Sequence, residues 1–227
     1  MKNVRIKKGS IEHIDEVMKI LRRTIKPFEN PISTEIGHLT QSPYMVLVSC
    51  LLSLRTMDKV TGPVCKRLFA IAHTPEQIAS MPLKKLEDLI RPVNFYKTKA
   101  LRIKEISKQI VKEHSGKVPL TFEELLSFKG VGRKTANIVM VYGHSSTDHI
   151  AVDIHVHRIP NRLGWISTSK PEDTEERLKQ IVPKKYWSQI NDWLVAFGQN
   201  ICLPVAPKCS ICPLFVYCER RGVTKSR

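Results

Sequence analysis

Four of the six cysteines lie within the last 26 residues, close enough along the chain to bind one metal centre. They are Cys202, Cys209, Cys212 and Cys218, and their spacing is C-x6-C-x2-C-x5-C. Because the interior of a cell keeps thiols reduced, we expect a metal or an iron–sulfur cluster here rather than disulfides. Zinc sites commonly pair two C-x2-C knuckles, and this segment has only one such knuckle. The spacing also differs from the ferredoxin patterns, so by itself it leaves zinc and an iron–sulfur cluster open.

A glycine turn followed by a basic helix start is the second segment with chemical potential. Gly130 and Gly132 flank a single residue, and Arg133 and Lys134 open the helix that follows. Glycines lack the Cβ atoms that would hold a phosphate away, and the N–H groups at a helix start attract anions. A lone G-x-G also occurs in ordinary helix–helix turns. The turn alone therefore predicts only a candidate phosphate contact.

The charge balance favours a polyanionic partner. Lys and Arg total 37 against 21 Asp and Glu, a formal net charge of +16. This excess attracts nucleic acid over long range, although charge does not separate DNA from RNA. RNA binding is disfavoured because no RNA-module motif is present. No apolar run is long enough to span a membrane, and no apolar signal segment follows the basic start. We therefore expect an intracellular protein.

Helical periodicity dominates the elements that must position these residues. Helices are predicted at about 11–25, 43–52, 96–114, 122–128, 133–142, 171–181 and 184–199. Caps mark several of their starts, at Ser10 and Ser42 and in capping boxes at Thr74 and Thr121. Strand alternation is weak, which predicts an all-α fold. The helix at 96–114 has an apolar face and a face of lysines, which are Lys97, Lys99, Lys104, Lys108 and Lys112. Cys50 and Cys65 lie alone in apolar stretches and are predicted to be buried core thiols.

Three segments together resemble one family. Residues Gly130–Asn137 resemble the helix-hairpin-helix motif of the endonuclease III family of DNA glycosylases. Residues Ala151–Arg158 resemble the segment that carries the family's catalytic aspartate, here Asp153, which lies nineteen positions after Lys134. The cysteine spacing resembles the family's 4Fe-4S loop, cysteine for cysteine.

The resemblance runs from about Pro43 to Arg221 and implies a fold. This is the two-domain, all-α helix-hairpin-helix DNA glycosylase fold with a C-terminal 4Fe-4S cluster loop. It implies a six-helix barrel at about 36–147. It also implies a second domain from 1–35 plus 148–227 that carries the cluster loop at 202–218.

The resemblance also implies a bifunctional DNA N-glycosylase and apurinic/apyrimidinic lyase of base excision repair. Lys134 would be the nucleophile that attacks C1′ of the sugar, displaces an oxidised pyrimidine and forms a Schiff base before β-elimination nicks the strand. Asp153 would stabilise cationic charge at C1′ and relay protons. The plainer alternatives are a solvated helix residue for Lys134 and a helix N-cap for Asp153. The expected partner is double-stranded DNA with damaged bases or abasic sites, bound by a monomer in the cytoplasm or nucleoid of a prokaryote.

Further DNA contacts follow from the same resemblance. Residues Leu51–Asp58 resemble the loop that fills the gap left by the extruded base, with Arg55 where the family often has glutamine. Arginine favours guanine acceptors on the orphaned base. Residues Asn94–Ala100 resemble a second intercalating loop in which Phe95 is the wedge; the alternative is a core residue before a helix. The other expected contacts are Lys129, Gly130, Gly132 and Arg133 in the hairpin, and His155.

Two other functions remain open at this point. A mismatch-specific glycosylase of the same superfamily is disfavoured because such relatives tend to lack the nucleophilic lysine. A non-catalytic DNA-binding module with a structural zinc would retain the charge and the cysteines without the chemistry.

Overall fold

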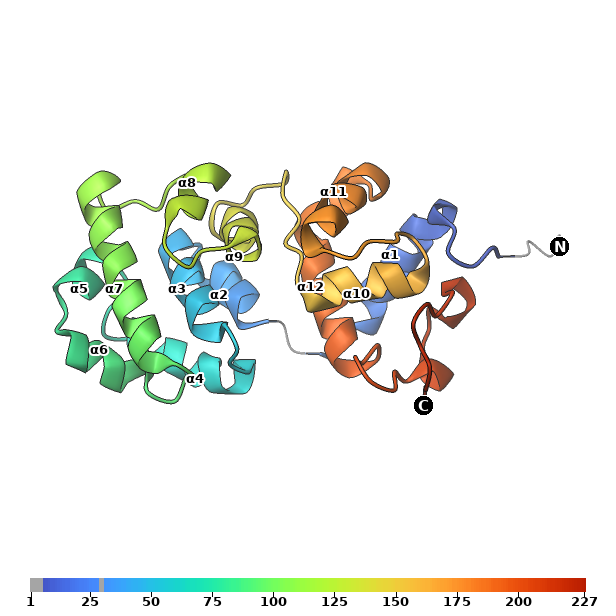
Figure 1. Ribbon diagram of the computed structural model, residues 1–227, viewed down its shortest axis with the longest axis horizontal. Helices are drawn as coiled ribbons and strands as arrows, with labels where there is room; N and C mark the ends of the chain where they lie inside the picture. Colours follow the sequence, from blue (N-terminus) through green and yellow to red (C-terminus); the bar gives the residue numbers. More distant parts are fainter. Residues whose placement is uncertain (1–5, 29–30) are drawn as a thin grey trace. The chain divides into compact units, whose positions relative to one another are not determined.

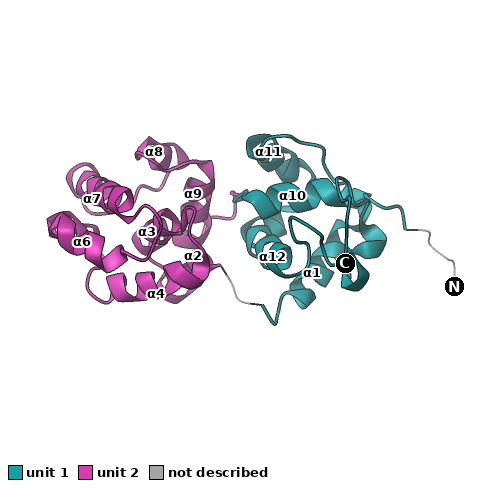
Figure 2. Cartoon of the chain, turned by 60° about the horizontal axis from the view of Figure 1, so that its bottom comes forward, with its two compact units in different colours: residues 1–30, 150–227 teal, residues 31–149 magenta. Residues whose placement is uncertain are grey.

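The computed structural model describes residues 6–28 and 31–227 and contains no strand within them. The all-α prediction is confirmed. Contacts divide the chain into two compact units, residues 31–149 (unit 2) and residues 1–30 with 150–227 (unit 1; Figure 2). The chain therefore passes between units near residues 30 and 150, whereas the sequence placed these boundaries near 36 and 147.

Unit 2 is built around a buried central helix. In chain order its elements are α2 (Ile32–Thr40), α3 (Pro43–Ser53), α4 (Asp58–Phe69), α5 (Pro75–Ser80), α6 (Leu83–Ile90), α7 (Tyr96–Glu113), α8 (Phe122–Ser127), α9 (Arg133–Ile138) and the π-helical η2 (Val139–Gly143). Nearly every side chain of α3 is buried, as its apolar composition requires. Helices α2, α4, α7 and α9 pack against it, and α5 and α6 pack against α7 (Figure 1).

Local sequence explains most helix starts in this unit. Ser42 Oγ accepts a hydrogen bond from Met45 N, and Pro43 occupies the first turn of α3. The capping box predicted at Thr74 is confirmed, with both reciprocal hydrogen bonds present. At Thr121 the hydroxyl accepts from the backbone N–H of Glu124, the first half of a capping box.

Unit 1 has its own core. Its elements are η1 (Ile11–His13), α1 (Ile14–Thr24), α10 (Ile154–Leu163), α11 (Pro171–Ile181), η3 (Lys184–Tyr186), α12 (Trp187–Asn200), η4 (Cys209–Ile211) and η5 (Phe215–Tyr217). The apolar stripe of α1, including Val17, Met18 and Leu21, is fully buried in a cluster with side chains of α10 and α12. Pro160 lies inside α10 and is itself buried.

Several expectations need refinement. The helix expected at 133–142 is α9 followed by a π-helical turn, and the helix expected at 184–199 begins as the 3-10 turn η3 before α12. The buried state predicted for Cys50 and Cys65 is confirmed, with 3% and 1% of their surface exposed. Among the described residues, no helix combines the length and apolar character needed to cross a membrane.

Candidate active site and DNA-contact surfaces

The glycine turn presents open backbone at the start of α9. Gly130 has φ +86°, a left-handed conformation, and a Cβ there would meet the Arg102 guanidinium at 2.5 Å. Gly132 is the N-cap of α9 with an extended backbone, and no heavy atom of the described residues lies within 4 Å of where its Cβ would be. Lys129 and Arg133 flank the turn and are exposed. An anion has room to approach the first N–H groups of α9 closely.

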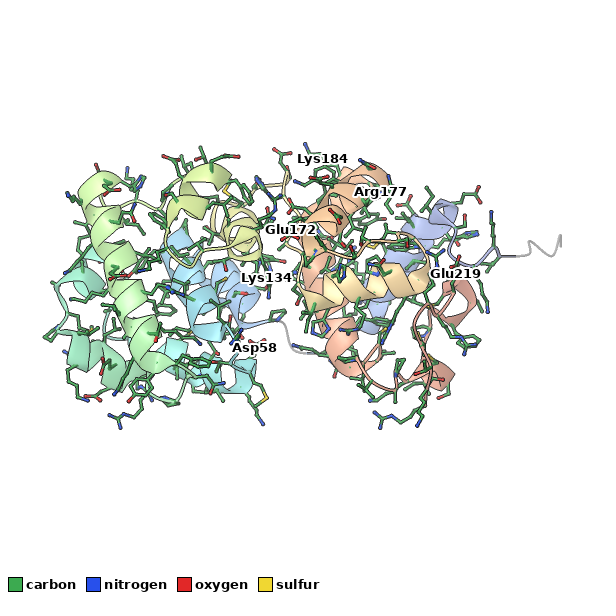
Figure 3. All side chains as sticks on the ribbon, in the orientation of Figure 1. Asp58, Lys134, Glu172, Arg177, Lys184 and Glu219 are labelled. Atoms are coloured by element: carbon green, nitrogen blue, oxygen red, sulfur yellow. The ribbon has the colours of Figure 1, made fainter. Side chains whose placement is uncertain are left out.

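Lys134 is the second residue of α9, and its side chain is exposed. Its charge acts on a buried thiol and on a partly buried carboxyl of unit 2. Burial raises the pKa of the Cys50 thiol on α3 to about 12, and Lys134 opposes that shift. Burial also raises the pKa of the Asp58 carboxyl at the start of α4, again opposed by Lys134. The amine therefore lies near a carboxyl group, and Figure 3 shows both labelled side chains on the same flank of unit 2.

Asp58 is a site residue that the sequence reasoning did not single out, although it ends the segment Leu51–Asp58. Its carboxylate accepts a hydrogen bond from the backbone of Ile32, at the start of α2, and is only partly exposed. The available signal was its position, an acidic residue opening a helix directly after the loop that carries Arg55. Nothing in that pattern indicates that α9 brings an amine nearby.

Asp153 is the N-cap of α10 in unit 1. Its Oδ1 accepts hydrogen bonds from His155 N at 2.8 Å and from Val156 N at 2.9 Å. The N-cap interpretation is therefore confirmed, and these bonds fix the orientation of the carboxylate. Capping and catalysis are compatible because one carboxylate carries two oxygens. Asp153 belongs to unit 1 and Lys134 to unit 2.

His155, one of the expected DNA contacts, is enclosed within unit 1. Only 9% of its surface is exposed, and its Nδ1 lies 3.0 Å from an Arg158 guanidinium nitrogen. The ring also lies against Gly198 of α12, where an added Cβ would clash with Nδ1. This packing suits a role in holding α10 against α12 more than direct contact with DNA.

Arg55 and Phe95 are the tips of two neighbouring loops of unit 2. Both adopt left-handed backbone conformations, with φ of 53° and 57°. Phe95 is 63% exposed, so the interpretation of it as a core residue is wrong. Both side chains line a cavity of about 300 Å³, together with Leu51, Leu54, Thr98, Lys99 and Arg102. An exposed aromatic ring and an exposed guanidinium beside one hollow are suited to contacting bases.

All four C-terminal cysteines line one apolar cavity in unit 1. Burial raises the pKa of the Cys212 thiol to about 12, and the other three thiols act in the same sense. Among the described residues, no three cysteine, histidine or acidic side chains meet closely enough to hold a single metal ion. The four thiols share the lining of one cavity. This donor set, four cysteines in an apolar cavity, fits an iron–sulfur cluster.

Helix α10 holds the cysteine loop in place. The Arg162 guanidinium donates to Leu203 O and to Pro204 O, each at 2.6 Å, and contacts Cys202 Sγ at 3.5 Å. One turn earlier, Arg158 donates to Cys202 O at 2.8 Å. The helix that Asp153 caps thus carries, on its later turns, two cations that bind the cysteine loop.

Comparisons with known proteins agree with this arrangement. Residues 48–184 match the sequence model of the HhH-GPD superfamily base excision DNA repair proteins. Endonuclease III of Thermotoga maritima is 44% identical over 209 residues, which cover 91% of this chain and 95% of that protein. The structure of a non-covalent endonuclease III–DNA complex matches with a TM-score of 0.82 at 30% identity, covering 93% of this chain and 96% of that one. A trapped covalent endonuclease III–DNA intermediate, an estranged-adenine complex, matches with a TM-score of 0.80 at 29% identity over the same shares of the two chains.

Proposed function

The chain belongs to the endonuclease III family within the HhH-GPD superfamily of base excision DNA repair proteins, and we propose that it excises oxidised pyrimidines from DNA and nicks the resulting abasic site. The observation that carries this proposal is Lys134, an exposed amine directly after an open glycine turn on α9. The protein binds, as a monomer, double-stranded DNA with damaged bases or abasic sites. It acts where the genome lies, in the cytoplasm and nucleoid of a prokaryotic cell.

Binding begins at the phosphate backbone. The N–H groups at the start of α9 meet a phosphate at Gly130 and Gly132, and Lys129 and Arg133 add positive charge. Such contacts position the duplex without reading its sequence. A base inside the stack is out of reach of any amine, so the damaged nucleotide must be extruded. Arg55 and Phe95 then occupy the space that the extruded nucleotide leaves.

Excision and nicking use the Lys134 amine as the nucleophile. Its Nζ lone pair attacks C1′, and the damaged base leaves with the electron pair of the glycosidic bond and takes up a proton. Ring opening gives a Schiff base between Nζ and C1′. Loss of a proton from C2′ then expels the 3′ phosphate, and water releases the cleaved product from Lys134.

Attack requires a neutral amine, and Asp58 is the candidate acceptor for the proton that Lys134 loses. An exposed lysine is charged at neutral pH. Asp58 lies near enough for the two charges to interact, and burial makes its carboxyl more basic than usual. Asp153 has a different role, because a carboxylate fixed by two backbone N–H bonds stabilises positive charge that develops at C1′.

The four cysteines would hold a 4Fe-4S cluster with a structural role. Such a cluster would supply cross-links for a loop that buries little apolar surface of its own. Arg162 and the backbone N–H of Arg220, 3.3 Å from Cys218 Sγ, would donate hydrogen bonds to the thiolates. Iron analysis and broad visible absorption test this assignment, and a zinc-only protein contradicts it.

Borohydride trapping tests the proposed chemistry directly. Reduction of the Schiff base should join the wild-type protein covalently to a duplex containing thymine glycol. Lys134→Ala should abolish trapping, and Lys134→Arg should do the same while keeping the positive charge for DNA binding. Unchanged nicking of abasic DNA by Lys134→Ala would refute the assignment of the nucleophile. A parallel panel of thymine and adenine mismatches separates this function from a mismatch-specific glycosylase.

A further inference from the structure

Lys99 is a buried lysine that the sequence assigned to the lysine face of its helix. It lies in the first turn of α7, and only 7% of its surface is exposed. Its Nζ donates three hydrogen bonds, to Leu52 O at 2.7 Å, to Leu54 O at 2.7 Å and to Thr56 Oγ1 at 3.0 Å. All three acceptors belong to the end of α3 and the loop after it, the loop whose tip is Arg55.

Asn94 makes a second connection between the same two segments. Its side-chain nitrogen donates to Arg55 O at 2.5 Å, and its backbone N–H donates to Thr56 Oγ1 at 3.2 Å. Phe95 is the next residue along the chain. The two loop tips are therefore tied through backbone atoms beside them, and the Thr56 hydroxyl accepts from both Asn94 and Lys99.

Only the ammonium form of Lys99 can donate to all three of these acceptors at once. An ammonium has three N–H donors, and here three oxygens accept them. Leu52 O and Leu54 O lie at the C-terminal end of α3, where carbonyls lack helical partners and the helix dipole favours a cation. The other charged groups around the same cavity are Arg55 and Arg102, which are cationic and do not neutralise it.

We propose that Lys99 is a positioning residue that locks the Leu52–Thr56 loop to α7, so that Arg55 and Phe95 enter the DNA as one rigid wedge. This inference rests on the proposed function, because a wedge matters only if a nucleotide is extruded. Both tips hold left-handed conformations that non-glycine residues seldom adopt, and such conformations persist only when neighbouring bonds enforce them. Without the lock, each encounter with DNA would first have to order the loops.

A matched pair of variants separates positioning from ordinary helix capping. Lys99→Met keeps the apolar stem and removes the donors. Lys104→Met makes the same change on the same helix, because Lys104 donates to Ala79 O at 2.8 Å and to Met81 O at the end of α5, away from both tips. Lys99→Met removes a buried charge together with its bonds, and Lys104 is only partly buried, so we expect both variants to fold.

The single-turnover rate at which thymine glycol is excised from a duplex measures how well the two loop tips support extrusion of the nucleotide. We expect Lys99→Met to lower this rate by about tenfold or more, since small misplacements of positioning groups have effects of this size. The fluorescence of 2-aminopurine opposite the lesion should rise less than with wild type. Nicking of a single-stranded abasic oligonucleotide needs no extrusion and should change less than about twofold. Lys104→Met should match wild type in all three measurements.

The pH dependence of duplex excision provides a further test, because a purely structural role of Lys99 in capping α3 would not change it. Burial lowers the pKa of Lys99 to about 8. As pH rises through that value, the amine loses one donor and turns a lone pair toward an acceptor. The ratio of duplex excision to single-stranded nicking should therefore fall above about pH 8 in wild type and stay flat in Lys99→Met.

Thr56→Val provides an independent check because it removes the shared acceptor without removing a buried charge. It should reduce duplex excision while sparing single-stranded nicking. If wild type is active and Lys99→Met excises from duplex at the same rate, the inference is overturned. It is also overturned if Lys99→Met and Lys104→Met lose duplex excision equally. An inactive wild type would instead refute the proposed function.

Discussion

Gly132→Ala is the sharpest test of the phosphate contact, because the structure separates its effect on folding from its effect on binding. Gly132 has φ −100° and ψ 175°, a conformation open to any residue, and no described atom lies within 4 Å of the added methyl group. Replacing glycine at such a position restricts the unfolded chain and stabilises by about 0.4–1 kcal/mol. Alanine is a poorer N-cap residue than glycine, which offsets this gain, so we expect the free energy of unfolding to stay nearly level.

Binding, in contrast, should weaken. The methyl group would occupy the space through which a phosphate reaches the N–H groups at the start of α9. Loss of one hydrogen bond to a charged group costs about 1.5–3 kcal/mol, which corresponds to roughly a tenfold to hundredfold loss of affinity. Fluorescence anisotropy with a duplex that carries a stable abasic-site analogue measures this, and urea unfolding of the same preparation measures stability.

Gly130→Ala is the matched control. At φ +86° a side chain is strained, at a cost of about 1–2 kcal/mol, and its Cβ would also displace the Arg102 guanidinium. That variant should lose stability as well as affinity. If Gly132→Ala binds abasic DNA as tightly as wild type, the open backbone at the start of α9 is not a phosphate contact.

Three further predictions follow from the site. Asp153→Asn should lower base excision while leaving affinity for DNA nearly unchanged, because an amide oxygen still caps α10; loss of binding measured by anisotropy would instead indicate a purely structural cap. Arg162→Gln should loosen the cysteine loop by removing bonds to Leu203 O and Pro204 O, and should reduce the iron retained after purification. The lowered pKa of Lys99, about 8 in the folded protein, means that the unfolded chain binds more protons above that pH. The free energy of unfolding should therefore rise between about pH 8 and 10.5, by roughly 3 kcal/mol at most, relative to Lys99→Met in urea titrations.

The sequence predicted the helices that have capping residues at their starts or a clear helical periodicity. Ser42 with Pro43 marked α3, Thr74 marked α5, and the extents predicted for α7 and α11 agree with the structure within a residue or two. Helices α2, α4 and α6 were not predicted. Pro63 lies inside α4 and reads as a breaker, and neither α2 nor α6 begins with a residue whose side chain caps it. Their stability comes from packing within unit 2, which local patterns do not record.

Side-chain burial was the harder quantity to predict, and two site residues show why. Lys99 and Lys104 read as equivalent members of one lysine face, yet Lys99 is almost fully enclosed. The difference arises from the end of α3, more than 40 positions away, whose carbonyls need donors. Asp58 likewise became a site residue only when the fold brought the charge of Lys134 near enough to act on its carboxyl. Periodicity identifies which side chains share a face, but the partner across that face is set by tertiary structure.

Residues that carry out chemistry and residues that support them differ in how well the sequence reveals them. Motifs gave Lys134, Asp153 and the four cysteines because their chemistry depends on residue type at a fixed spacing. The groups that support the neighbouring loops, Lys99 beside Arg55 and Arg158 and Arg162 beside the cysteines, bind backbone oxygens of distant segments. A backbone oxygen is present at every position, so such contacts leave no signature in the sequence that supplies the acceptor. Lys99 and Arg158 lie inside segments that resemble the family, yet nothing in those segments shows which backbone oxygens they bind. Substitutions at these supporting cations should therefore alter activity through contacts that sequence likeness alone does not reveal.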